Sequence, residues 1–155
     1  MNDYRWDDLA IGMKAQFEVD LTPDLMTTFA SLSGDLNPLH VDDGFAKAAG
    51  FPGRVVYGLL TSSFYSTLVG VHLPGKYALL DGIDIEFKSP AYIGDHLTVS
   101  GEIVFLNDTY HRLEIKAKIQ TQDGKLISKS KIRAGVVPHS SVVTQTLVCD
   151  REGPQ

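Results

Sequence analysis

The chain has 155 residues, of which 43% are hydrophobic and 21% charged, and it carries a net charge of −5. These values are typical of one soluble globular domain that buries its own core without disulfides or metal ions. The acidic balance argues against a nucleic-acid-binding protein, although a local basic patch remains compatible with a small anionic ligand. Cys149 is the single cysteine, no apolar run approaches the roughly 18 residues of a membrane helix, and the N-terminus is polar. We therefore expect a cytoplasmic protein that binds neither nucleic acid nor membrane.

The first predicted elements are a strand and a helix. Residues 13–21 alternate between apolar and polar side chains, which is the pattern of a half-buried strand. Thr22, Pro23 and Asp24 then provide a capping hydroxyl, a proline at the first helical position and an acid in the first turn. The spacing of Leu25, Phe29 and Leu32 gives this helix one apolar face.

Two further helices are predicted after an irregular segment. Pro38 disfavours helix at Asn37, so residues 34–40 are expected to form a turning loop. A short helix is predicted over residues 42–49, ended by Gly50. Residues 58–69 carry small and apolar side chains almost all round, so this helix should be buried.

The second half of the chain is predicted to be sheet. Apolar residues alternate with polar ones over 83–87, 97–105 and 111–120. In the second of these segments, one face is shared by Leu97, Val99, Ile103 and Phe105. Asp123-Gly124 is a hairpin signal that leads into a partner strand over 125–137. Short turns make the sheet mostly antiparallel, and the buried helix is the natural element to cover its apolar face. The expected fold class is thus α+β, a single domain with an antiparallel sheet around a central helix, and the role of residues 138–155 is left open.

Asp35 and His40 are the candidate catalytic pair. A carboxylate and an imidazole around one water can remove a proton from the water and return one to a neighbouring carbon. Pro38 and Asn37 interrupt the helix, which allows the two side chains to converge. The same residues also fit an Asx turn and a structural histidine, so spacing alone leaves both interpretations open.

Gly58 is the candidate for binding a carbonyl oxygen. The first N–H groups of a helix are unpaired and carry partial positive charge, and glycine lets a ligand approach them closely. The alternative is a simple bend between loop and helix. Lys129, Lys131 and Arg133 share one strand face and could meet phosphates, but a solvated face of an exposed strand is the favoured interpretation, so we do not name them as binding residues.

The segment from Phe29 to His40, with its Asp-x-Asn-Pro-x-His core, resembles the hydratase motif of MaoC-like proteins, which include the (R)-specific enoyl-CoA hydratases. The likeness continues through Val41-Asp42 and Phe45-Ala46, and resumes at 55–60, at 87–90 and at Gly94-Asp95. It covers Met13 to Val137.

The resemblance implies a hot-dog fold, a homodimer, and reversible syn hydration of a trans-2-enoyl thioester to the (R)-3-hydroxyacyl thioester. By position it implies that Asp35 and His40 hold and activate the water, with Asp35 as base, and that the Gly58 N–H binds the thioester oxygen. Asn37 would fix the loop, and Ser66 and Val69 would line the acyl pocket. No cofactor is implied beyond the CoA or acyl carrier of the substrate itself.

One position departs from the family pattern. Family members often have His before this glycine, whereas this chain has Tyr57, which we expect to reshape the substrate pocket. A dehydratase acting on a carrier-protein or unusual acyl substrate, a hot-dog thioesterase and a non-catalytic acyl-binding subunit are the competing interpretations.

Overall fold

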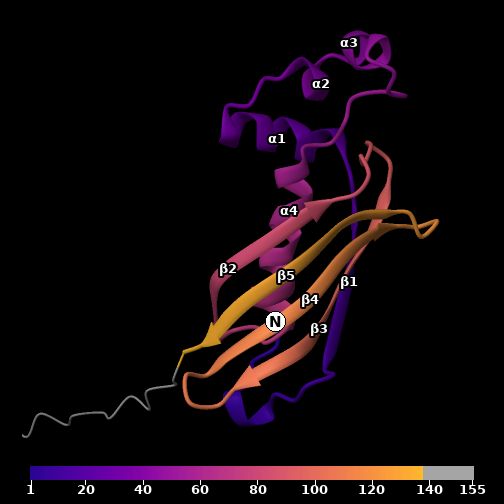
Figure 1. Cartoon of the computed structure of the whole chain (residues 1–155). Coiled ribbons are helices and arrows are strands. Elements are labelled where there is room, and N and C mark those ends of the chain that lie inside the picture. Colours follow the sequence, from indigo (N-terminus) through magenta and orange to yellow (C-terminus); the bar gives the residue numbers. More distant parts are fainter. Residues whose placement is uncertain (138–155) are drawn as a thin grey trace, which may run out of the picture.

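The computed structural model describes residues 1–137, which form one curved sheet and a set of helices (Figure 1). In chain order the elements are η1 (Trp6–Asp8), β1 (Lys14–Asp20), α1 (Pro23–Ser33), α2 (Pro38–Val41), α3 (Asp43–Ala48), α4 (Gly58–Thr67), η2 (Leu68–His72), β2 (Ala78–Phe87), β3 (His96–Asn107), β4 (Arg112–Thr121) and β5 (Leu126–Val136). The predictions for residues 138–155, including Cys149, lie outside the described residues.

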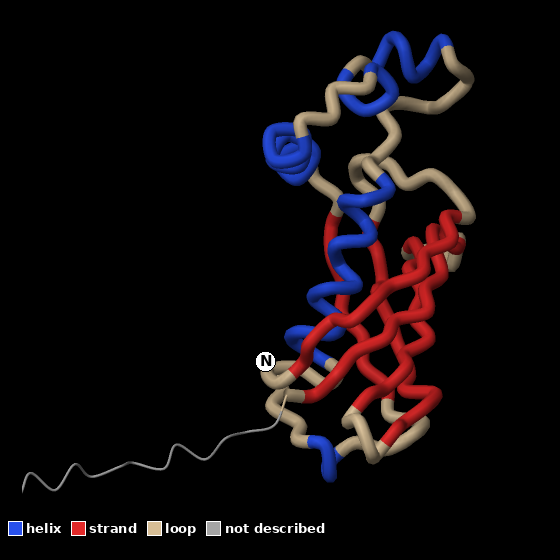
Figure 2. Tube along the Cα trace, turned by 60° about the vertical axis from the view of Figure 1, so that its left-hand side comes forward, coloured by secondary structure: helices blue, strands red, loops and turns tan. Residues whose placement is uncertain are grey.

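The sheet has five strands in the order β1-β3-β4-β5-β2, and every pairing within the described residues is antiparallel. α4 runs along one face of this sheet, and α1, α2 and α3 gather beyond its N-terminal end (Figures 1 and 2). The predicted arrangement, an antiparallel sheet around a central helix, is therefore confirmed.

The core lies between α4 and the inner face of the sheet. Alternate strand residues point inward and are almost completely buried: Leu97, Val99, Ile103, Leu113, Ile115, Ile119 and Ile132. Tyr65 and Leu68 cover them from the helix side, and neither has exposed surface. The Tyr65 and Ser128 hydroxyls share a hydrogen bond of 2.8 Å, which satisfies two buried polar groups, and burial raises the pKa of Tyr65 to about 12.

Three sequence predictions about the elements are wrong in detail. Leu32 is exposed rather than buried, because Met26 takes the inward position on α1. Phe105 is exposed because the β3–β4 register shifts between Ile103 and Phe105, which turns the following side chains over. His111 precedes β4 in a turn with a φ of 49°, where its ring stacks on Trp6.

The buried helix also differs from the expectation at its C-terminal end. The α-helical part ends at Thr67, and the chain continues as a π-helical turn through Leu68–His72. Leu59, Ser63 and Ser66 are exposed, so residues 1–137 leave one side of α4 uncovered.

Candidate active site

The Asp35–His40 segment is held by short side-chain to backbone bonds. Gly34, with a φ of 72°, ends α1 in the left-handed conformation. Asp35 Oδ1 then accepts the Asn37 N–H at 3.0 Å, and Asn37 Oδ1 accepts the Leu39 N–H at 3.0 Å. Asn37 is thus the N-cap of α2, with Pro38 at the first helical position.

The prediction of an irregular loop through His40 is therefore wrong. Proline is disfavoured inside a helix but suits its first position, where the N–H would be unpaired in any case. Pro38 consequently begins the short helix α2, and His40 lies within it.

The His40 ring has a fixed tautomer in its neutral form. Its Nδ1 lies 2.7 Å from the Val55 carbonyl oxygen, and a carbonyl can only accept, so Nδ1 carries the hydrogen and donates it. Nε2 is left with a free lone pair. A backbone bond of 3.0 Å from the Val55 N–H to the Leu39 carbonyl ties the same two segments together.

Tyr57 is buried against the Asp35–His40 segment and contacts both candidate catalytic residues. It is only 2% exposed. Its hydroxyl donates to the Asp35 carbonyl oxygen at 2.8 Å, and its ring centroid is 4.0 Å from that of His40, tilted by 32°. The Tyr57 ring also contacts that of Phe29, with the two ring centroids 5.0 Å apart.

Gly58 begins α4 directly after Tyr57. Its N–H is the first of the helix and has no acceptor within it. A Cβ at this position would lie 3.0 Å from two ring carbons of Phe87, so glycine allows the Phe87 ring of β2 to approach the helix end closely. The Gly58 N–H therefore lies where the helix dipole places local positive charge.

The structure brings together five of the seven residues predicted for the site: Asp35, Asn37, His40, Tyr57 and Gly58. The other two lie farther along the helix. Ser66 is exposed on α4, about 12 Å along the axis from Gly58 at the usual helical rise, and Val69 is buried in η2.

Sequence reasoning missed Val55 and Phe29. Val55 acts through its backbone carbonyl, which no side-chain pattern could indicate, and Phe29 had been assigned only to the apolar face of its helix. Within residues 1–137 no group of three or more His, Cys, Asp or Glu side chains is arranged to hold a metal ion. None of the helices described there has the length and apolar character needed to cross a bilayer.

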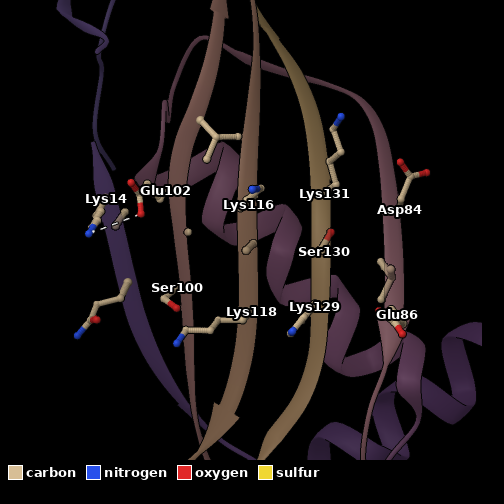
Figure 3. A pocket seen from close by; sticks show the side chains of 16 residues that line it. Lys14, Asp84, Glu86, Ser100, Glu102, Lys116, Lys118, Lys129, Ser130 and Lys131 are labelled. Atoms are coloured by element: carbon tan, nitrogen blue, oxygen red, sulfur yellow. Dashed lines mark ion pairs between the residues drawn. The ribbon is translucent and has the colours of Figure 1, made fainter. Parts of the chain in front are cut away.

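A large hollow lies elsewhere, on the outer face of the sheet (Figure 3). It measures about 1180 Å³, and lysines from β4 and β5 surround its centre: Lys116, Lys118, Lys129 and Lys131. Lys131 pairs with Glu114 at 2.9 Å, and Arg133, just beyond the hollow, pairs with Asp84 at 2.5 Å. None of the five residues gathered at the helix end lines this hollow, so it is not a substrate pocket for them.

Comparison with known proteins gives a consistent result. Residues 8–126 match the family model described as MaoC like domain. The chain is 36% identical over 118 residues to an (R)-specific enoyl-CoA hydratase of Aeromonas caviae, covering 76% of this chain and 88% of that protein. It is also 36% identical over 88 residues to a mitochondrial 3-hydroxyacyl-[acyl-carrier-protein] dehydratase of Arabidopsis thaliana, covering 57% of this chain and 52% of that one.

The fold comparison agrees. The solved structure of the (R)-hydratase from A. caviae involved in PHA biosynthesis superposes with a TM-score of 0.80 at 32% identity, covering 83% of this chain and 98% of that one. With the family model matching most of the chain and the same hot-dog architecture in its structural relatives, the chain belongs to the MaoC-like domain family.

Proposed function

We propose that the chain catalyses the reversible syn hydration of trans-2-enoyl-CoA thioesters to (R)-3-hydroxyacyl-CoA thioesters. The observation that carries this proposal is that Tyr57, which directly precedes Gly58 at the start of α4, contacts both the Asp35 backbone and the His40 ring. The 36% identity to an (R)-specific enoyl-CoA hydratase supports the choice of reaction.

In this proposal one water donates its two hydrogens to the two acceptors. One acceptor is the Asp35 carboxylate, and the other is Nε2 of the neutral His40 ring, whose hydrogen is on Nδ1 and is donated to the Val55 carbonyl. As the water oxygen bonds to C3, Asp35 takes one proton and then delivers it to C2 on the same face. His40 holds the remaining O–H. Because the oxygen and the proton are added to the same face of the double bond, the addition is syn, and because Asp35 gives back the proton it took, the pair ends in its starting state.

The thioester oxygen gains negative charge as the C3–O bond forms. The Gly58 N–H, strengthened by the helix dipole, is the donor we assign to that oxygen. A carboxylate, an imidazole and an amide thus supply the acid–base and charge-stabilising chemistry, so we propose no cofactor beyond the thioester itself.

The wider assignments follow from the same family. We propose a homodimer, an acyl pocket to which Ser66 and Val69 contribute, and the cytoplasm as the compartment, which a chain with a single cysteine suits. A second candidate function is dehydration of a 3-hydroxyacyl group on an acyl carrier protein, because a relative of that name is 36% identical.

The test follows the loss of enoyl absorbance with crotonyl-CoA and longer trans-2-enoyl-CoAs. We expect Asp35→Asn and His40→Ala each to lower turnover by about a hundredfold or more, as the loss of a positioned acid or base does. Asp7→Asn, in the N-terminal η1 segment, is the control and should keep wild-type activity. Circular dichroism should find all variants folded.

Two outcomes would contradict the proposal. Wild-type rates in either Asp35→Asn or His40→Ala would remove the assigned mechanism. A wild type that ignores every enoyl-CoA but dehydrates the same acyl group on a carrier protein would favour the second candidate, and chiral analysis of the product checks the (R) configuration.

A further inference from the structure

Tyr57 makes contacts that no substrate-binding role explains. Its side chain is almost completely buried, so its surface is occupied by protein. Those neighbours include the Phe29 ring, the His40 ring and, at the hydroxyl end, the Asp35 carbonyl oxygen.

The hydrogen bond from Tyr57 to Asp35 spans a much longer stretch of sequence than the other hydrogen bonds of Asp35. The Asp35 N–H donates to Ser33 Oγ at 3.2 Å, and the Asp35 carboxylate accepts from Asn37, so both bonds stay within the same turn. The Tyr57 hydroxyl reaches Asp35 across 22 positions of sequence. It is therefore the hydrogen bond that fixes the turn relative to α4.

The contact with His40 fixes the other catalytic side chain. The Val55 carbonyl holds one edge of the His40 ring, which still leaves rotation about that bond. The Tyr57 ring, at 4.0 Å, covers one face of the imidazole and restricts that rotation. Together the two contacts set the direction of Nε2.

Tyr57 also controls the third group by its place in the chain. It is the N-cap of α4, and its carbonyl accepts the Thr61 N–H at 3.2 Å, so the helix starts from it. The next residue is Gly58. A single residue thus contacts or precedes all three groups that the proposed reaction needs.

We propose that Tyr57 is a positioning residue, which sets Asp35, His40 and the Gly58 N–H relative to one another and does not itself bind the substrate. This inference rests on the hydratase function proposed above. Burial, together with the nearby Asp35 charge, raises the pKa of Tyr57, so the hydroxyl stays protonated and remains a donor at neutral pH.

The central experiment compares Tyr57→Phe and Tyr57→Leu with wild type in crotonyl-CoA hydration. Tyr57→Phe keeps the ring and loses the bond to Asp35, and we expect kcat to fall about tenfold while KM changes less than about twofold. Tyr57→Leu also loses the ring against His40, and we expect kcat to fall about a hundredfold, the usual scale for a misplacement of about 1 Å.

Tyr65→Phe is the matched control. Tyr65 is also buried and also makes a 2.8 Å hydroxyl hydrogen bond, but with Ser128 in the core. It should lose stability to a similar or greater degree and keep kcat within about twofold. A structural role alone would make kcat follow stability in all three variants.

Amide hydrogen exchange gives a readout that does not depend on turnover. Exchange of the peptide covering residues 34–41 should speed up in both Tyr57 variants and stay unchanged in Tyr65→Phe. An inactive wild type with this exchange pattern would contradict the hydratase function and leave the positioning role supported. An active wild type, with kcat and exchange both unchanged in Tyr57→Phe and Tyr57→Leu, would overturn this inference.

Discussion

At the scale of single residues, the candidate site depends on backbone groups as much as on side chains. The Val55 carbonyl decides which nitrogen of His40 is free, and the Asp35 carbonyl receives the Tyr57 hydroxyl. A sequence names the side chains but not these carbonyl partners. A motif therefore indicated Asp35 and His40 as the candidate pair, which stays a prediction, whereas the tautomer of His40 and its place in a helix could not be read from the sequence.

His96 provides a prediction about pH at the same scale. Its Nδ1 lies 2.7 Å from Asp20 Oδ1 and its Nε2 3.3 Å from Glu18 Oε2, where β1 pairs with β3. The hydrogen bond to Asp20, followed by that to Glu18, raises the pKa of His96 above its ordinary value. Its contribution to stability is therefore fully present below the unfolded pKa of about 6.5 and is lost as pH rises through the folded pKa.

We expect His96→Gln to unfold at a lower urea concentration than wild type at pH 5.5. The difference should shrink as the pH approaches 9, because the wild-type imidazole is then neutral as well. Urea titrations at several pH values measure this. A gap of constant size from pH 5.5 to 9 would mean that packing, and not charge, is the contribution of His96.

At the scale of elements, the periodicity of the sequence predicted where strands and helices lie, but it did not predict features that depend on how strands pair. Alternation located the strands, and the capping signal at Thr22 marked the start of α1, since each has a local physical cause. The bulge that exposes Phe105 depends on pairing with β4, a contact between distant segments that leaves no local signal. The same holds for Leu32, whose exposure depends on where α1 lies.

Gly101 shows how closely the helix approaches the sheet. A Cβ at this position on β3 would lie 2.7 Å from Leu68 Cδ2 and 2.9 Å from Ile115 Cγ2, and both neighbours are fully buried. Neither can move aside without disturbing the core. We expect Gly101→Ala to lower the free energy of unfolding by about 1–3 kcal/mol, the usual cost of overpacking.

Gly70→Ala is the matched control for that change. Gly70 lies in η2, close to Leu68 in sequence, and a Cβ there would meet nothing within 4 Å. Its stability should stay within about 0.5 kcal/mol of wild type, as for substitutions away from special features. Equal urea midpoints for the two variants would show that the approach of η2 to β3 is looser than the structure has it.

At the scale of the whole molecule, the two edges of the sheet differ. β1 is short, and Lys14, Gln16, Glu18 and Asp20 give it charged and polar exposed positions, which discourage pairing with another chain. β2 is longer and exposes Leu79 by 50% and Phe87 by 51%. On α4, the exposed Leu59 adds another apolar side chain. The β2 edge is therefore the one expected to form the proposed homodimer.

A two-fold dimer through β2 would place Leu79 of both copies in one interface, so each substitution acts twice. We expect wild type to sediment at twice the chain mass of 17.0 kDa. Leu79→Lys should sediment as a single chain, because the substitution places two ammonium groups in that interface. Phe105→Lys is the control, since Phe105 is similarly exposed but lies on β3, which β4 and β5 separate from β2, and it should leave the dimer intact. A wild type that sediments at 17.0 kDa would refute the homodimer. A dimer that survives Leu79→Lys but dissociates in Phe105→Lys would instead place the interface on the outer face of the sheet, where the lysines of β4 and β5 would then have to be covered.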